Sequence, residues 1–262
     1  ILPTSKFQNK DATISAKIVD LPYKKESNYN YIMQVEEING EKVKKFRTKV
    51  SSPEPLEADV YDTFTGKVHF YLPKSTRTFD YEKHYRSKNI YLCCYAYNYL
   101  PYDVKCSSNE FNINKEILLL RAKLISCTRS TFPEKLANVM NGFLLGEKHN
   151  FPDDIKNNFD KIGVYHLIST SGIHICILSS FLLKILKKLK LGNKISVLIS
   201  CAAIFFFMAL TCFTPSVMRA GIMIITYNLG TIFFRKSDSL NSLGVAIMAI
   251  ILPNPNAALG IN

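Results

Sequence analysis

Apolar and polar positions alternate with a period of two along the first hundred residues. The runs TISAKIV (13–19) and YIMQVEEI (31–38) show this period, which is typical of half-buried strands. Asn39-Gly40 follows the second run and precedes another β-patterned run, EKVKKFRTKV. Asn-Gly between two such runs is a strong hairpin signal, because both turn residues take a positive φ. The pattern therefore predicts a two-stranded hairpin centred on Asn39-Gly40.

Two later runs, VYDTFTGKVHFYL (60–72) and NIYLCCYAYNYL (89–100), bring the strands to four or five. This number of strands in such a short segment fits a small barrel such as an OB-fold, and a compact β-sandwich is the alternative. We therefore predict a β-domain over residues 1–116.

After residue 116 the pattern changes to long apolar runs. Residues 195–213 carry no charge, and nineteen residues are about the length that crosses a ~30 Å hydrocarbon core. Three other segments have a similar composition: 164–183, 217–234 and 240–252. Any one of them could instead be a buried helix of a soluble core, but four within a hundred residues favour a membrane. The expected fold class is thus an α+β membrane protein, with a small N-terminal β-barrel (OB-like) domain and a polytopic α-helical transmembrane domain over 117–262.

Residues 132–160 contain two amphipathic helices in this prediction. FPEKLANVMNGFLLG places apolar residues at helical spacing, and FPDDIKNNFDKIG begins with proline and acids, as helices prefer. We expect both helices to lie on the outer membrane surface, to cover a pore mouth, or to pack on neighbouring helices.

Charge is distributed unevenly along the chain, whose formal net charge is +12. Residues 1–116 hold 18 basic and 15 acidic residues, and residues 117–262 hold 15 basic and 6 acidic residues. Five lysines lie between positions 184 and 194, in the first loop of the apolar region. Under the positive-inside rule this loop is cytoplasmic, so the β-domain is expected on the outer side of the membrane. The chain begins at Ile1 without a visible signal peptide, and both ends, the C-terminal one included, are expected to be cut from a longer protein.

The seven cysteines form no CxxC pair and no cluster with metal-ligand spacing. We therefore predict no metal site and no cofactor. A disulfide between Cys94 and Cys106 is an option if the first half lies outside the cell. Free, buried thiols are the alternative.

Tyrosines and basic residues are interleaved between residues 67 and 99. Exposed aromatic rings stack on bases and cations follow phosphates, so this composition suits single-stranded nucleic acid. The alternative is that the tyrosines are simply good strand residues. The candidate DNA-binding residues are Lys67, Tyr71, Lys74, Arg77, Lys83, Arg86 and Lys88.

The apolar segment that starts near residue 164 has a polar first half. His166, Ser169, Thr170, Ser171 and His174 fall within nine positions. Polar groups inside a membrane are expensive unless they meet water or partners. We therefore expect a water-filled path beside this segment, and hydrogen bonds between neighbouring helices are the alternative.

Two long segments, GFLLGEKHNFPDDIKNNFDKIGVYHLISTSGIHI (142–175) and the run from PSVMRAG to LPNP (215–255), resemble the ComEC competence family. The earlier FDYEKHYRSKNIY is similar to the end of that family's OB-like domain. Departures are mild, at Glu147, Thr170 and Ile173. The resemblance covers the chain from the β-domain to its last residues.

The resemblance implies an inner-membrane channel for single-stranded DNA during natural transformation. Its partners would be single-stranded DNA, the lipid bilayer and other components of the uptake machinery. Many family members end in a metallo-β-lactamase-like domain, which these 262 residues do not contain, so no enzyme activity is predicted for them. The family-motif residues, expected to line the channel, are His166, Ser169, Ser171, Gly172, His174, Pro215 and Arg219.

Two other classes of protein fit part of the sequence. A solute transporter with an external β-domain would show the same apolar runs. An intramembrane serine hydrolase would use Ser171 as the nucleophile and His174 as its base. GxSxG is absent, and we see no acid in the apolar segments to orient the histidine.

Overall fold

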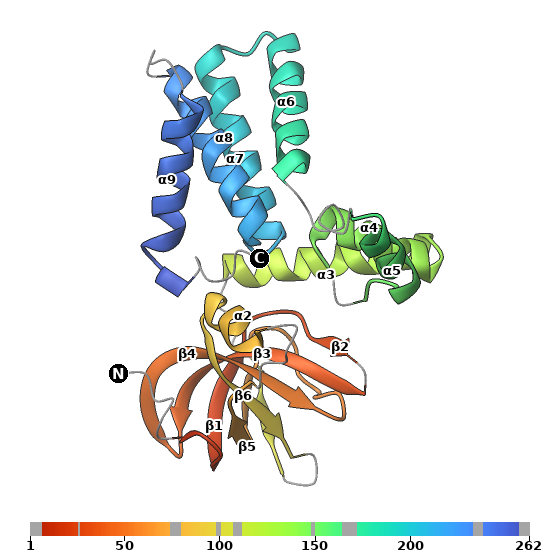
Figure 1. Cartoon of the computed structure of the whole chain (residues 1–262), viewed down its shortest axis with the longest axis vertical. Coiled ribbons are helices and arrows are strands. Elements are labelled where there is room, and N and C mark those ends of the chain that lie inside the picture. The colour runs from red at the N-terminus through yellow and green to blue at the C-terminus, as the bar shows by residue number, and fades with distance from the viewer. Residues whose placement is uncertain are drawn as a thin grey trace. The chain divides into compact units, whose positions relative to one another are not determined.

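The computed structural model describes residues 7–25, 27–73, 80–97, 101–106, 112–147, 150–163, 172–232 and 238–256, without the side chains of residues 153 and 160. The chain divides into two compact units. The first comprises Ile1–Ala122 and Asn254–Asn262, and the second comprises Lys123–Pro253. Figure 1 shows the strands and helix α2 (Tyr81–Ser87) in the first unit, and helices in the second.

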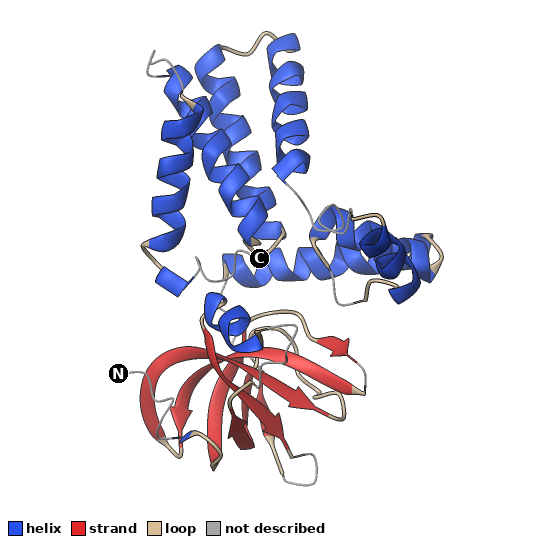
Figure 2. Cartoon of the chain, viewed as in Figure 1, coloured by secondary structure: helices blue, strands red, loops and turns tan. Residues whose placement is uncertain are grey.

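A closed, five-stranded barrel forms the first unit (Figure 2). Its hydrogen-bonded order is β1-β3-β4-β6-β5, and β5 pairs again with β1 to close the ring. All neighbours are antiparallel except β4 and β6, which are parallel. The strands are β1 (Asp11–Ile18), β3 (Asn28–Ile38), β4 (Glu41–Ser52), β5 (Thr63–Tyr71) and β6 (Ile90–Ala96). Closure confirms the OB-like barrel and excludes the sandwich.

Two short strands extend the barrel sheet at its sides. β2 (Tyr23–Lys25) pairs with β3, and β7 (Asp103–Lys105) pairs with β5. The predicted hairpin between β3 and β4 is confirmed, with φ values of 51° at Asn39 and 82° at Gly40. The Asn39 side chain also accepts a hydrogen bond from the Thr13 backbone N–H at 2.9 Å, which ties the turn to β1.

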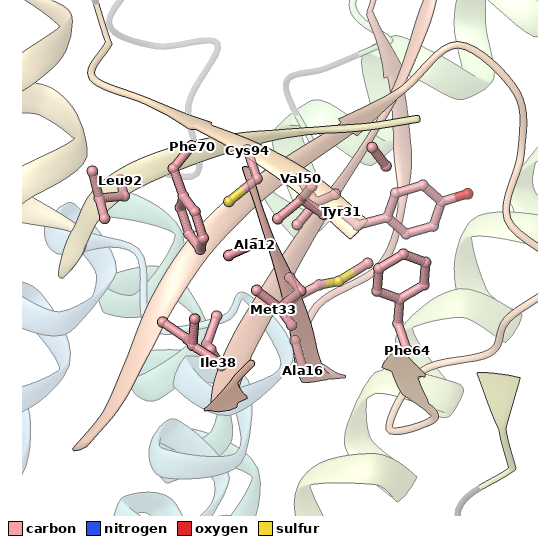
Figure 3. Close-up of a cluster of buried hydrophobic side chains, with 14 of the residues drawn as sticks. Ala12, Ala16, Tyr31, Met33, Ile38, Val50, Phe64, Phe70, Leu92 and Cys94 are labelled. Carbon is pink, nitrogen blue, oxygen red and sulfur yellow. The ribbon is translucent and has the colours of Figure 1, made fainter. Parts of the chain in front are cut away.

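The barrel core follows the predicted alternation of residues. Ile14, Met33, Val50, Val68 and Phe70 point inward and are fully buried. Figure 3 shows side chains from all five barrel strands in this cluster. Burial of one such side chain contributes about 1.5–3 kcal/mol to the free energy of unfolding, so this core stabilises the folded domain.

The structure contains free thiols at Cys94 and Cys106, in line with the alternative to the disulfide. Cys94 faces the barrel core, fully buried, with its Sγ 3.1 Å from the Thr48 hydroxyl. Cys106 is exposed just after β7. A core position and a surface position leave no shared space for a bridge.

We expect the three cysteines of the β-domain to differ in reactivity. Burial raises the pKa of the Cys93 thiol to about 11, and it raises the pKa of Cys94 further. Both therefore remain protonated and shielded near pH 8, whereas Cys106 is open to solvent. With the other four cysteines changed to serine, mass spectrometry should find one maleimide per native chain and three after denaturation. No label on the native chain would point to the disulfide instead.

Helices make up the rest of the described chain (Figure 1). Their bounds are α3 (Ile113–Thr131), α4 (Glu134–Leu145), α5 (Asp153–Lys161), α6 (Gly172–Lys188), α7 (Asn193–Leu210), α8 (Pro215–Ile232) and α9 (Ser239–Ile251). Helices α4 and α5 fall within the segment predicted to hold two amphipathic helices, and α4 ends at Gly146 in the left-handed conformation. The sequence reading did not anticipate α3.

Helices α6, α7, α8 and α9 overlap the four predicted membrane segments. Within the described residues, α7 is the one helix both long and apolar enough to cross a membrane, and α9 is apolar but shorter. The crossings by the other segments stay a prediction. Residues Ile175, Ile204, Met208 and Val217 form a buried cluster that holds α6, α7 and α8 together.

Candidate functional site

The outer face of the barrel holds one group of predicted DNA-binding residues. Cross-strand pairing places Asp11, His69 and Tyr95 in one row across β1, β5 and β6. Lys67 lies in the next row along β5, opposite Thr13. Tyr97, which follows β6, packs edge-on against Tyr95 with ring centroids 6.2 Å apart. The closed barrel thus gathers two tyrosines, a histidine and a lysine on one surface.

Asp11 is the centre of this surface. Its Oδ1 lies 2.7 Å from His69 Nδ1 and accepts a 3.3 Å hydrogen bond from the Tyr97 hydroxyl, and its Oδ2 lies 3.9 Å from Lys67 Nζ. The hydrogen bond to His69 holds the pKa of this exposed carboxyl below its usual range, aided by Tyr97 and by the charge of Lys67. Asp11 therefore stays ionised at neutral pH and orients the residues around it. Exposed ion pairs are weak, so Lys67 can still reach a phosphate.

Helix α2 (Tyr81–Ser87) carries the second group of candidate residues. Asp80 caps its first turn, where it accepts from the Lys83 backbone N–H at 3.1 Å. The Lys83 ammonium lies 3.2 Å from Asp80, and the Arg86 guanidinium lies 2.6 Å from Glu82. Lys88 is the C-cap residue. All of these charges are on the surface, so the pairs restrain the side chains only weakly.

Tyr71 and Lys49 mark where α2 meets the barrel. Lys49 lies opposite Cys93, which lies opposite Tyr71, in one row across β4, β6 and β5. The Lys49 ammonium is 3.4 Å from the Tyr85 hydroxyl of α2. Burial raises the pKa of the Tyr71 phenol, so this tyrosine is a packed residue more than an exposed platform. The structure thus brings Lys67 together with His69, places Lys83, Arg86 and Lys88 on α2, and leaves Lys74 and Arg77 outside the described residues.

The N-terminal ends of α6 and α8 form the second candidate site. Gly172 is the first residue of α6, and a Cβ built on it would lie 2.9 Å from the Cβ of Ala220 in α8. His174 is half-buried two residues further on, while Pro215 and Arg219 in the first turns of α8 are exposed. His166, Ser169 and Ser171 lie outside the described residues. Two segments more than forty residues apart therefore meet at Gly172 and Ala220.

Three buried polar residues lie further along α6, α7 and α8. Ser179 and Ser200 are buried with their hydroxyl oxygens 3.5 Å apart, which joins α6 to α7. Asn228 in α8 is 6% exposed, and its Nδ2 has no hydrogen-bond partner among the described residues. Counted from the Gly172–Ala220 contact, Ser179 and Asn228 are seven and eight residues along their helices, or about 10–12 Å at 1.5 Å per residue. The three residues therefore share one level of the bundle.

Sequence reasoning missed several of these residues. Asp11 and His69 are 58 positions apart, so their pairing depends on the closure of the barrel. Asn228 lies in an apolar run of the sequence, and only the fold shows that its side chain is buried. Within the described part of the chain, no three His, Cys, Asp or Glu side chains are grouped to hold a metal ion.

The chain belongs to the class of proteins that combine an OB-like barrel with an apolar helical bundle, and comparison with known proteins shows what it resembles. Residues 143–261 match the family model Competence, described as Competence protein. The chain is also 25% identical, over 177 residues, to ComE operon protein 3 of Bacillus subtilis (strain 168). This alignment covers 68% of the chain and 22% of that relative, so the chain spans less than a quarter of the relative's length. No solved structure matches the chain. The chain is therefore similar to the Competence family over residues 143–261 and to ComE operon protein 3 over a longer stretch.

Proposed function

We propose that this chain is part of an inner-membrane channel that takes up single-stranded DNA during natural transformation. The observation that carries the proposal is the close approach of Gly172 to Ala220, which joins the two segments that resemble the competence family. The similarity to the Competence family supports a role in DNA uptake, and the polar residues inside the bundle support a path for a polar substrate.

Helices α6 to α9 are the proposed membrane segments. Exposed side chains along them are mostly large and apolar, among them Ile177, Phe181, Leu198, Phe205 and Met248, as a lipid-facing surface requires. Five lysines lie at the end of α6, in the connection to α7 and at the start of α7. Under the positive-inside rule they favour a cytoplasmic position for this connection and an external position for the β-domain.

The β-domain is the proposed first contact for DNA outside the membrane. Lys67, His69, Tyr95 and Tyr97 on the barrel offer stacking surfaces and positive charge, which is what a strand of DNA needs. The basic residues on α2 extend the positive charge beside the barrel.

We expect the whole chain, in detergent micelles, to bind single-stranded DNA with an affinity that falls as salt rises. Each phosphate contact releases a counterion, so the logarithm of the binding constant decreases with the logarithm of the salt concentration by about 0.7 per contact. Changing Lys83, Arg86 and Lys88 together to alanine should flatten this slope by about two units, measured by fluorescence polarisation.

A control with the same loss of charge is available on β4. Lys42, Lys44 and Lys45 are exposed near the hairpin and do not belong to α2. Their replacement by alanine should leave most of the slope intact. Equal slopes for both triple variants would mean that α2 is not a specific contact, and binding that ignores salt would contradict the proposed DNA-binding surface.

A further inference from the structure

The short segment Asn254–Asn256, which follows α9, belongs to the same compact unit as the barrel. Its sequence is Asn-Pro-Asn. The Asn254 side chain donates a hydrogen bond through Nδ2 to the backbone carbonyl of Ser87, at 2.7 Å. The Asn256 side chain donates another through Nδ2 to the Tyr91 hydroxyl, at 3.3 Å. Two side chains therefore bind the place where α2 ends and β6 begins, which is 167 positions away along the chain from Asn254.

The Asn-Pro-Asn sequence holds these two side chains in a fixed relation. The Asn254 Oδ1 accepts a hydrogen bond from the backbone N–H of Asn256 at 3.1 Å, so the segment forms an Asx turn. Pro255 has a fixed φ and disfavours the helical conformation of the residue before it. Both ends of the Asn254 amide are thus in use, because its oxygen closes the turn while its nitrogen donates to Ser87.

Helix α2 depends on the groups that cap its ends. It has seven residues, none of which is buried, and helices of this length are not stable by themselves in water. The last carbonyls of a helix have no partner within it. Backbone N–H groups of the next two residues donate to the carbonyls of Tyr85 and Arg86. The following carbonyl, that of Ser87, receives its hydrogen bond from Asn254, which therefore completes the C-terminal cap.

We propose that the segment Asn254–Asn256 holds α2 in the position in which its basic residues meet the phosphates of single-stranded DNA. The two asparagines are then positioning residues, since they carry no charge and act on DNA binding through the helix. The inference rests on the proposed function, in which Lys83, Arg86 and Lys88 provide the phosphate contacts.

The first measurement is hydrogen–deuterium exchange of the whole chain in detergent micelles, followed by mass spectrometry. Asn254→Ala should make the amides of α2 exchange up to about fivefold faster, because the helix loses one capping hydrogen bond. Tyr91→Phe removes only the acceptor of the second bond, so it should have the same effect to a smaller extent. Asn241→Ala is the matched control, because it changes an exposed asparagine of α9, and it should leave exchange in α2 unchanged.

The second measurement is the affinity of the same variants for a twelve-nucleotide oligo-dT, by fluorescence polarisation at constant salt. Asn254→Ala should weaken binding by up to about fivefold. The same substitution should have no further effect in a chain whose Lys83, Arg86 and Lys88 are already alanine, because its effect passes through these residues. A general loss of structure would weaken binding in both chains.

Unchanged exchange in the α2 of Asn254→Ala would overturn the positioning role, and so would faster exchange with an unaltered affinity for the oligonucleotide. An equal loss of affinity in the presence and absence of the three basic residues would overturn it as well. Failure of the unchanged chain to bind the oligonucleotide would contradict the proposed DNA-binding function itself. The exchange measurement would then still show whether Asn254 holds the helix.

Discussion

Cells that carry Gly172→Leu are expected to lose transformation almost completely. The first residue of α6 lies so close to α8 that even a Cβ would come within 2.9 Å of the Cβ of Ala220. Alanine has no flexible end that could move aside, so the two helices must separate. Overpacking of this kind costs about 1–3 kcal/mol, and here it acts where the two family-motif segments meet. Transformation frequency, with the amount of protein in the membrane measured by immunoblot, is the readout.

Two smaller substitutions distinguish a specific effect on the Gly172–Ala220 contact from a general loss of folding. Gly172→Ala introduces the same Cβ and should lower transformation moderately, and Ala220→Gly in the same protein should restore much of it by removing the opposing atom. Gly244→Leu in α9 is the control, because a Cβ there meets nothing within 4 Å. Normal transformation by Gly172→Leu would show that the approach of α6 and α8 is irrelevant to uptake. Lack of rescue by Ala220→Gly would place the defect elsewhere than in this contact.

The parts of the barrel that depend on local sequence signals, its strands and its hairpin, could be predicted. Alternation identified the strands and Asn39-Gly40 identified the hairpin, because both depend on neighbours in the chain. The pairing of β1 with β5 could not be predicted, since it joins residues such as Asp11 and His69 that are far apart in the sequence. This pairing closes the barrel and builds the candidate surface.

Two helices escaped prediction for a different reason. Helix α2 lies in a polar stretch with no apolar periodicity, and none of its residues is buried. The Asp80 cap and the ion pairs of the helix support it in place of a hydrophobic face. Helix α3 carries apolar residues on its exposed side as well, such as Leu120 and Leu124, which blurs the expected pattern. In both helices the local signal that sequence reasoning uses is weak.

The candidate sites were predicted in part. Lys67 was identified, but its neighbours Asp11 and His69 were not, because their place beside Lys67 depends on the pairing of β1 with β5. Interleaved tyrosines and cations led to the prediction of a nucleic-acid surface, yet Tyr71 is half-buried, which raises the pKa of its phenol. Composition therefore suggested such a surface, and the register of the strands decides which of these residues lie together.

Asn228→Leu is expected to block DNA uptake without lowering the stability of the protein. The Asn228 amide is buried, and its Nδ2 has no partner among the described residues. An unsatisfied buried donor costs about 1–3 kcal/mol, so leucine, of similar size, should leave stability unchanged or raise it. We expect the Asn228 amide to line a hydrated path together with Ser179 and Ser200. Leucine at this position would remove the polar group and exclude water from the path.

The two effects are measured separately, stability by thermal unfolding in detergent and uptake by transformation frequency. Asn228→Ser keeps a polar group and room for water, so it should retain most of the uptake. Ser179→Ala removes one donor of a pair 3.5 Å apart and should reduce uptake only partly, since such a bond is worth about 1 kcal/mol. If Asn228→Leu instead lowered the melting temperature and uptake in parallel, Asn228 would be a hydrogen-bonding link between helices. That result would exclude a path for DNA at this level of the bundle. An Asn228 amide that donates its hydrogen bond to a neighbouring helix cannot donate the same bond to passing DNA.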